Sequence, residues 1–400
     1  MGRVGVIGTF DSKEKELIYL IKELESLDVV TIDVGIYECN YPVDIRMSDY
    51  IPENELNKIR NCRDNDLAMT VICNTIEKEL KHIVEDESLN GIIGMGGGRG
   101  TAIVTCGMRT LPVGFPKICI STIASGNNRP YVGTKDIIMI PSIVDLNGIN
   151  PVFCEIIAES AAAMKGMVSI NATGKAKREK AVFITSYGNV EKCVQYCVEL
   201  LQNAGKKVMI FHATGTGGRA MEELVREGYA EAVLDITTTE WADELCGGIL
   251  NAGKDRLDAA GACGIPQVIV PGCIDMVNFA GMDTVPKGYR GRKLYSWNPE
   301  VTLMRTTVEE NRELGKIFAK KANHSKGKTV FLIPEKGFSM LGADGKLFED
   351  RTADKAFEKA LKSQLNENIP VYRVPCNIND LTFAKVAVKY ILELLEGKEQ

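Results

Sequence analysis

The sequence predicts an α/β protein made of two Rossmann-like domains, each a mostly parallel sheet with helices on both faces. Three observations carry this prediction. Short apolar segments of strand length alternate with longer amphipathic segments, which is typical of β-α units in parallel sheets. The chain has 400 residues, more than the roughly 250 to 300 residues at which a single core usually stops growing. A polar, basic stretch at 171–180 separates two segments that follow a similar order.

The first half begins with the strand-like segment RVGVIGTF and continues into a helix-like segment. In that helix Leu17, Ile21, Leu24 and Leu27 recur at the three-and-four spacing of one helical face. A second helical pattern occupies residues 67–83. Further segments of strand length are VVTIDVGIY, GIIGMGG, KICISTI and IIMIPSIVD. This alternation predicts an amino-terminal nucleotide-binding domain at 1–175.

The second half, 176–400, repeats the order of the first. From Ala181 a strand, a hydroxyl-bearing turn, an amphipathic helix, a strand, a glycine-rich turn and a helix follow one another. We therefore expect the two domains to share one topology. In sheets of this kind ligands bind at the carboxyl ends of the strands, so the loops that follow the strands are the candidate sites.

Composition excludes several classes of partner. The net charge of -5 offers no basic stripe for nucleic acid, and no apolar window approaches the length of a membrane span. The amino terminus lacks the pattern of a secretory signal. Twelve cysteines are scattered without any Cys-x-x-Cys spacing, which favours reduced cysteines and a cytoplasmic protein without a metal centre.

The stretch NGIIGMGGGRGTAIV at 90–104 is the strongest candidate site. It lacks the lysine of a Walker loop, and its glycine spacing does not fit the dinucleotide fingerprint. A strand, a glycine loop and a helix start nevertheless aim backbone N–H groups at one point, which favours a bound phosphate. The alternative is a tight crossover that needs glycine only for packing. The residues concerned are Gly96, Gly97, Gly98, Arg99, Gly100 and Thr101.

Two other loops of the first half carry polar groups at strand ends. STIASGNN places Ser125 and Asn127 after one strand, where they suit a sugar, a phosphate or a hydrated metal, or simply cap a helix. GTFDSK places Thr9, Asp11 and Lys13 after the first strand. Asp11 or Ser12 also fits the role of a helix N-cap.

The second half offers catalytic candidates. His212 precedes a second glycine loop that ends at Arg219, and a histidine in that position is either a catalyst or a hydrogen-bonded structural residue. Thr237 and Glu240 fit a capping box as well as a site. Asp275 follows a later strand, and Arg305 would join it in a second polar pocket.

These loops together resemble an uncharacterised protein family that includes the amino-terminal domain of the tomato mosaic virus resistance protein. The stretches that carry the resemblance are GMGGGRGT, STIASGNNRPYVGT, PSIVDLNGIN, FHATGTGGRAMEEL, TTTEWADEL, PGCIDMVNF, DTVP and NPEVTLMRTT. The resemblance implies a two-subdomain α/β protein that binds ATP in its amino-terminal half and forms dimers. The family's phosphate loop matches Gly96, Gly97, Gly98, Gly100 and Thr101.

The expected function is therefore ATP binding together with an enzymatic activity on an unidentified small metabolite in the cleft between the domains. Mg²⁺ would bridge the phosphates, with Asp11 or Asp145 anchoring its waters. One alternative is a nucleotide sensor that regulates a partner without turnover. Another is an enzyme that binds a sugar acid or carboxylate through His212, Arg219, Asp275 and Arg305, without a nucleotide.

Overall fold

A computed structural model describes residues 2–61, 65–172 and 179–397. The chain divides into two compact units, Met1–Lys177 and Arg178–Gln400, which we call unit 1 and unit 2. The boundary predicted at residue 175 lies outside the described residues. Within the described ranges, no helix combines the length and the apolar character needed to cross a membrane.

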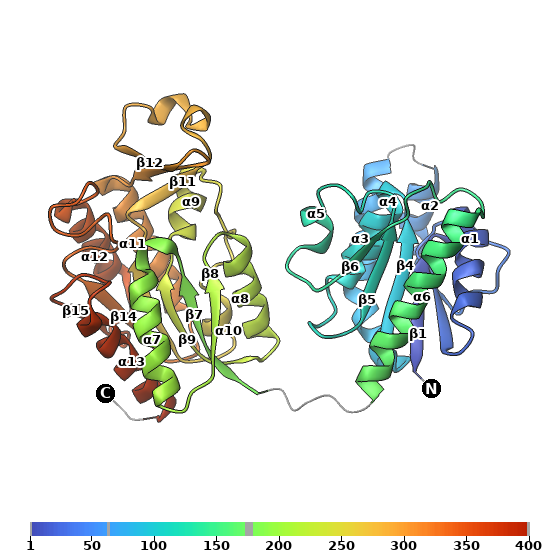
Figure 1. Ribbon diagram of the computed structural model, residues 1–400, viewed down its shortest axis with the longest axis horizontal. Coiled ribbons are helices and arrows are strands. Elements are labelled where there is room, and N and C mark those ends of the chain that lie inside the picture. The colour runs from blue at the N-terminus through green and yellow to red at the C-terminus, as the bar shows by residue number, and fades with distance from the viewer. Residues whose placement is uncertain (1, 62–64, 173–178, 398–400) are drawn as a thin grey trace. The chain divides into compact units, whose positions relative to one another are not determined.

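Unit 1 contains a six-stranded sheet in the order β3-β2-β1-β4-β5-β6, and every neighbouring pair is parallel. Figure 1 shows its helices on both faces of the sheet. The strands are β1 (Arg3–Gly8), β2 (Asp28–Asp33), β3 (Ile45–Arg46), β4 (Gly91–Gly96), β5 (Lys117–Ser121) and β6 (Ile138–Pro141). The helices are α1 (Phe10–Glu23), α2 (Glu53–Asn61), α3 (Asn65–Asp86), α4 (Gly98–Met108), α5 (Arg129–Val132) and α6 (Pro151–Ala172), with a 3-10 turn at Met47–Tyr50.

Alternating strand residues supply the two cores of unit 1. Val4 and Val6 of β1 pack with α1 and α6 on one face, whereas Ile7 packs with α3 and α4 on the other. All three side chains are fully buried. Because a parallel strand covered by helices on both faces has no solvent side, these strands read as continuous apolar runs.

Unit 2 contains a second parallel sheet, in the order β15-β14-β10-β9-β7-β8, and a small antiparallel sheet, β11-β13-β12. The strands are β7 (Ala181–Ser186), β8 (Val208–His212), β9 (Ala230–Thr237), β10 (Gln267–Gly272), β11 (Met276–Phe279), β12 (Leu294–Asn298), β13 (Val301–Arg305), β14 (Thr329–Pro334) and β15 (Val371–Val374). The helices are α7 (Glu191–Asn203), α8 (Thr216–Arg226), α9 (Glu240–Cys246), α10 (Ala259–Ala262), α11 (Val308–Asn323), α12 (Arg351–Gln364) and α13 (Leu381–Leu395). Short 3-10 turns occupy Gly188–Val190, Met282–Thr284 and Lys287–Tyr289.

The predicted fold class is confirmed, but the prediction that both halves share one topology is wrong. In unit 1 the first strand, β1, lies between the second and the fourth strands of its unit, β2 and β4. In unit 2 the first strand, β7, lies between the second and the third, β8 and β9. The two units differ in where the chain crosses to the other side of its first strand. After β2 the chain adds the outer strand β3 before it crosses over β1 to form β4, whereas after β8 it crosses over β7 at once to form β9.

Candidate functional site

The first glycine loop, residues 96–100, joins the end of β4 to the start of α4. Gly97 is the N-cap residue of α4, with φ -72° and ψ -165°, and no side chain caps the helix. The first backbone N–H groups of a helix have no partner inside it. These N–H groups and the positive end of the helix dipole therefore make the loop a ready anion site.

The glycines of this loop divide into two kinds. A Cβ added at Gly96 would lie 2.5 Å from the backbone of Gly100 and Thr101, so the fold itself requires glycine there. A Cβ at Gly98 would have no atom within 4 Å, and at Gly97 and Gly100 the nearest atoms lie 3.9 and 3.8 Å away. None of the four has a positive φ, so the chain conformation does not demand glycine either. Neither packing nor backbone geometry explains the bare backbone of Gly97, Gly98 and Gly100.

Thr101 lies behind the loop. Its side chain is fully buried, and its hydroxyl group donates to the carbonyl oxygen of Gly96 at 3.0 Å and lies 2.6 Å from Ser121 Oγ. This hydroxyl group fixes the loop to β5. Of the six residues predicted for phosphate binding in this segment, Thr101 is the one that does not line the cavity described next.

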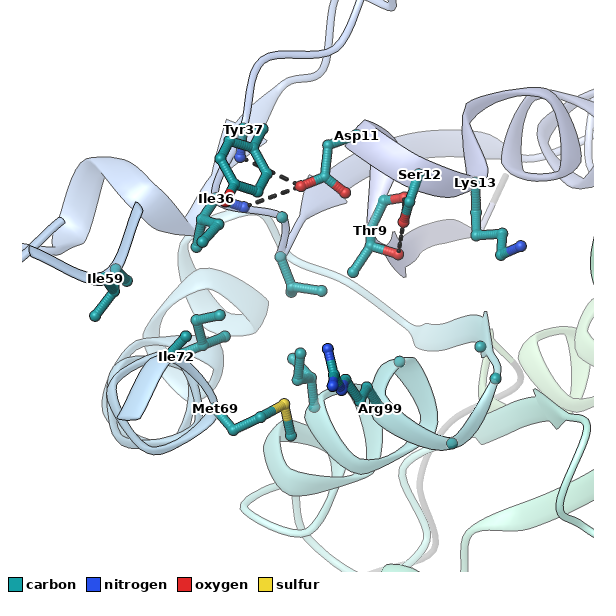
Figure 2. A pocket seen from close by; sticks show the side chains of 18 residues that line it. Thr9, Asp11, Ser12, Lys13, Ile36, Tyr37, Ile59, Met69, Ile72 and Arg99 are labelled. Carbon is teal, nitrogen blue, oxygen red and sulfur yellow. Dashed lines mark hydrogen bonds between the residues drawn. The ribbon is translucent and has the colours of Figure 1, made fainter. Parts of the chain in front are cut away.

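A cavity of about 350 Å³ opens beside the first glycine loop, and we call it the strand-end cavity. It lies where loops leave the carboxyl ends of β1, β2 and β4 (Figure 2). The strand order of unit 1 reverses between β1 and β4, and open α/β sheets bind ligands at such a switch point. The residues that line the strand-end cavity are Thr9, Asp11, Ser12, Lys13, Val34, Gly35, Ile36, Tyr37, Ile59, Ala68, Met69, Ile72, Gly96, Gly97, Gly98, Arg99, Gly100 and Ile103.

Two carboxylates fix the loops after β1 and β2, and one of them, Asp11, lines the cavity. Asp11 Oδ2 accepts hydrogen bonds from the backbone N–H groups of Ile36 and Tyr37, both at 3.2 Å. Figure 2 shows these bonds. Buried Asp33 accepts from Phe10 N at 3.0 Å and Gly35 N at 2.8 Å, and burial raises the pKa of its carboxyl group. The two carboxylates together join the loop after β1 to the loop after β2.

Asp11 is not the N-cap that the sequence suggested. The N-cap residue of α1 is Thr9, and its side chain accepts no capping bond from the helix backbone. Ser12 Oγ instead donates to Thr9 Oγ1 at 2.9 Å. The carboxylate of Asp11 points toward the loop after β2, which leaves the first turn of α1 open toward the cavity.

Lys13 and Arg99 supply positive charge to the strand-end cavity. Lys13 has a non-helical backbone within α1, with φ -129° and ψ 28°. Arg99 extends from the first turn of α4 (Figure 2), and its side chain is exposed. Within the described part of unit 1 neither side chain forms an ion pair, so both charges remain available to a ligand.

Three other residues predicted for unit 1 lie elsewhere. Ser125 and Asn127 are exposed in the turn after β5, where Asn127 Oδ1 accepts from Arg129 N at 3.2 Å. Asp145 is exposed in the loop after β6. The cavity lining includes none of the three, so the structure does not bring them together with the first glycine loop.

The second glycine loop, residues 215–218, already holds an anion, and that anion belongs to the chain. Glu240 Oε1 accepts from Gly215 N at 2.7 Å and from Gly218 N at 3.1 Å. A Cβ at Gly218 would collide with this carboxylate. The expected capping box from Thr237 to Glu240 is therefore wrong, because Glu240 is fully buried and reaches the glycine loop instead.

A buried guanidinium group completes this arrangement. Arg256 is 1% exposed and bonds to Glu240 at 2.7 Å, to Asp235 at 2.6 and 2.7 Å, and to Glu222 at 3.3 Å. The surrounding carboxylates raise the pKa of Arg256 despite its burial. Three carboxylates and one guanidinium group thus form the polar centre of unit 2.

His212 and Arg219 flank the second glycine loop without entering this network. His212 is exposed at the end of β8, and its ring stacks on Tyr187 with centroids 6.0 Å apart. Arg219 is half-buried in the first turn of α8. Because Glu240 fills the loop between them, they flank an anion site that is already occupied.

Asp275 and Arg305 are buried. Asp275 accepts from Ser339 Oγ at 2.6 Å, and burial raises its pKa to about 6. Arg305 donates to Asp354 at 2.7 Å and to the carbonyl of Phe348 at 2.7 Å. Its guanidinium group is engaged within the fold, where it ties the end of β13 to the segment that leads into α12.

A buried carboxylate that the sequence did not indicate is linked through Asn278 to Tyr187, the ring that stacks on His212. Asp243 of α9 accepts from the backbone N–H and the side-chain amide of Asn278, at 3.0 and 2.7 Å. Asn278 accepts from the hydroxyl group of Tyr187 at 2.6 Å. Burial raises the pKa of Asp243 to about 7. The available signal was an acidic residue three positions after Glu240 in the stretch EWADEL, which the same helical face would present.

Known proteins and family models match nearly the whole chain. Residues 2–173 match the N-terminal domain, and residues 179–395 the C-terminal domain, of an uncharacterised protein family, UPF0261. The chain belongs to the UPF0261 family. A UPF0261 protein of Clostridium tetani is 41% identical over 98% of this chain and 99% of its own. The tomato mosaic virus resistance protein Tm-1 of Solanum lycopersicum is 36% identical over 98% of this chain, which spans 56% of that protein.

The family membership confirms the resemblance that the sequence motifs indicated. Among solved structures, UDP-N-acetylglucosamine 2-epimerase from Rickettsia bellii covers all of this chain and 96% of its own, at 9% identity and a TM-score of 0.22. A likeness at that level carries no argument about function. Assignment of a function therefore rests on the geometry of the strand-end cavity.

Proposed function

We propose that the chain is an ATP-binding protein that holds the nucleotide phosphates on the first glycine loop of unit 1. The observation that carries this proposal is the open space at Gly97, Gly98 and Gly100. Three neighbouring glycines that neither packing nor backbone conformation requires leave backbone N–H groups accessible to a phosphate. The cavity volume of about 350 Å³ lies within the roughly 300–1,000 Å³ typical of small-molecule sites.

The second glycine loop supports this interpretation from within the same molecule. There a carboxylate, Glu240, sits on the N–H groups of Gly215 and Gly218. A loop of similar composition therefore binds an anion when one is supplied. The first glycine loop has no comparable partner among the described side chains, so its anion would come from a ligand.

The charges of the cavity favour a Mg-nucleotide over a free nucleotide. Lys13 and Arg99 are positive and Asp11 is negative, so the protein alone offsets little of a triphosphate's charge. No group of three or more histidine, cysteine or acidic residues in the described ranges is arranged to hold a metal ion. Mg²⁺ would therefore be held mainly by phosphate oxygens and water, with Asp11 as the protein group that anchors those waters.

The test of binding is isothermal titration calorimetry with Mg-ATP, ATP in EDTA, and Mg-ADP. We expect Mg-ATP to bind and EDTA to weaken its binding. If none of the three ligands gives a heat of binding, the proposal is contradicted. A phosphate-release assay over a panel of small metabolites then separates two cases: turnover supports an enzyme, and tight binding without turnover supports a nucleotide sensor.

The proposal extends to a cytoplasmic homodimer. The eleven described cysteines are all free, which suits a reducing compartment. The family resemblance implies dimers, and light scattering on the purified protein measures the mass that decides this. For a chain of 43.8 kDa, a species of that mass at micromolar concentration would contradict the dimer.

A further inference from the structure

The strand-end cavity has an apolar half, which we call the apolar compartment. Its walls are Ile36 and Tyr37 from the loop after β2, Ile59 from α2, and Met69 and Ile72 from α3. Figure 2 shows Ile59, Met69 and Ile72 across the cavity from Tyr37, away from Thr9 and Lys13. The cavity therefore combines charged groups suited to phosphate with apolar surface suited to a flat ring.

Three backbone polar groups in the loop after β2 are engaged within the fold. The N–H groups of Ile36 and Tyr37 donate to Asp11, both at 3.2 Å. The carbonyl oxygen of Ile36 accepts from Arg60 Nε at 2.6 Å. These three groups are therefore not available to form hydrogen bonds with the edge of a base. The side chains of Ile36 and Tyr37 present aliphatic surface and an aromatic ring to a ligand.

We propose that the apolar compartment holds the nucleobase without reading its hydrogen-bonding edge, so that the site accepts ATP and GTP alike. This inference rests on the proposed nucleotide function. A site built to hydrogen-bond a substrate rejects an analogue that lacks the matching group by a large factor, whereas an apolar pocket discriminates weakly between similar shapes. The phosphates then determine the position of the ligand, and the base adds affinity by stacking and burial.

Tyr37 is the residue that contributes most to this base contact. Its side chain is 56% exposed in the free protein, and its backbone N–H is fixed by Asp11. An exposed aromatic ring on a fixed backbone is a suitable stacking surface, and such stacking is tolerant of base identity because every base has a π-face. The hydroxyl group of Tyr37 is not needed for this role.

The experiment compares Mg-ATP, Mg-GTP and Mg-tripolyphosphate by calorimetry on the wild type, Tyr37→Ala and Tyr37→Phe. We expect the Kd values of ATP and GTP to agree within about tenfold, and tripolyphosphate to bind about tenfold more weakly or worse. Tyr37→Ala should weaken ATP and GTP about tenfold and leave tripolyphosphate unchanged. Tyr37→Phe should bind as the wild type does. Tyr50→Ala, another exposed tyrosine of unit 1 outside the cavity lining, is the matched control.

The outcomes separate this inference from the function on which it rests. ATP binding more than a hundredfold tighter than GTP would show that the base edge is read, and would overturn base tolerance while leaving nucleotide binding intact. Equal binding of ATP and tripolyphosphate, with no effect of Tyr37→Ala, would show that the compartment does not hold the base. If none of the three ligands binds, the proposed function fails and this inference fails with it.

Discussion

At the scale of single residues, the glycines of the first glycine loop answer two different physical demands. Gly96 is surrounded by the backbone of Gly100 and Thr101, so any side chain there would force the loop apart. Gly98 begins α4 with empty space around the position of a Cβ. The first glycine is required by the fold, and the second is free to serve a ligand.

This distinction predicts opposite effects on stability. Gly96→Ala should lower the free energy of unfolding of unit 1 by about 1–3 kcal/mol, because the added methyl group overpacks the loop. Gly98→Ala should leave it unchanged or raise it by up to about 1 kcal/mol, because alanine restricts the unfolded chain. Urea unfolding measures both.

Gly166→Ala is the matched control for these variants. Gly166 is an exposed glycine within α6 with no atom within 4 Å of a Cβ. The substitution Gly166→Ala should stabilise unit 1 by about 1 kcal/mol and leave ligand binding unchanged. A destabilised Gly98→Ala would mean that the fold requires glycine there, and the ligand argument would lose its basis.

Sequence reasoning identified the first glycine loop but not the role of every residue in it. A threonine that follows a glycine loop has the same sequence context whether its hydroxyl group faces a ligand or a neighbouring strand. The partner of Thr101 is Ser121, which is distant in sequence, so only the fold reveals the bond. The exposure of Ser125 and Asn127 likewise depends on where the turn after β5 lies.

At the scale of secondary-structure elements, the two glycine loops look alike in sequence and differ in what fills them. Both join a strand to a helix, and both include an arginine in the first turn of that helix. Glu240 occupies the second glycine loop, because α9 begins directly after β9 and its first residue reaches the backbone N–H groups of Gly215 and Gly218. The two loops are therefore alike in local sequence, whereas contacts between elements fill the second and leave the first open to a ligand.

Glu240→Gln should lower the stability of unit 2 by about 3 kcal/mol. The substitution removes a charge partner of buried Arg256 and places an amide donor among the N–H groups of Gly215 and Gly218. Glu244→Gln, on the same helix and only half-buried, should change stability by less than about 0.5 kcal/mol. Denaturant unfolding followed by tryptophan fluorescence suits this test, since Trp241 lies on α9. Equal effects of the two variants would contradict the account.

The pH dependence of unit 2 should reveal Asp243 of α9. Burial raises its pKa from 3.8 to about 7, so the folded state binds the proton more tightly than the unfolded chain does. The resulting stability is fully present below about pH 4 and is lost as the pH rises to about 7, by at most about 4 kcal/mol. In Asp243→Asn, which does not titrate, stability should decline less over that range. Parallel pH profiles of the two proteins would refute the assignment.

At the scale of the whole molecule, the sequence predicted two α/β units but not their different strand orders. The order of strands and helices along the chain is similar in both halves. The position at which a crossover returns to the sheet depends on packing between distant elements, such as the two-residue strand β3 that extends the sheet of unit 1. This return path places the switch point of unit 1 between β1 and β4, beside the first glycine loop.

The small antiparallel sheet of unit 2 was not predicted for a similar reason. In the sequence PGCIDMVNF resembles a loop after a strand, and NPEVTLMRTT is expected to contribute Arg305 to a polar pocket. In the structure β11 and β13 pair with each other within these two segments. This pairing buries Arg305, which the sequence placed in a ligand pocket. Long-range pairing therefore determines which of the polar residues remain available for chemistry.

The proposed function requires that Gly97 and Gly98 leave their backbone N–H groups accessible to a phosphate. Its most direct test is the thermal shift of wild type and Gly98→Val with Mg-ATP. Ligand at a hundred times its Kd stabilises by about 2.7 kcal/mol, which is roughly 5 to 10 °C for a unit of this size. We expect that shift in the wild type. Gly98→Val should melt near the wild-type temperature without ligand and show no shift, because its branched side chain occupies the space of a phosphate oxygen. A normal shift in the variant, or none in the wild type, would contradict the claim.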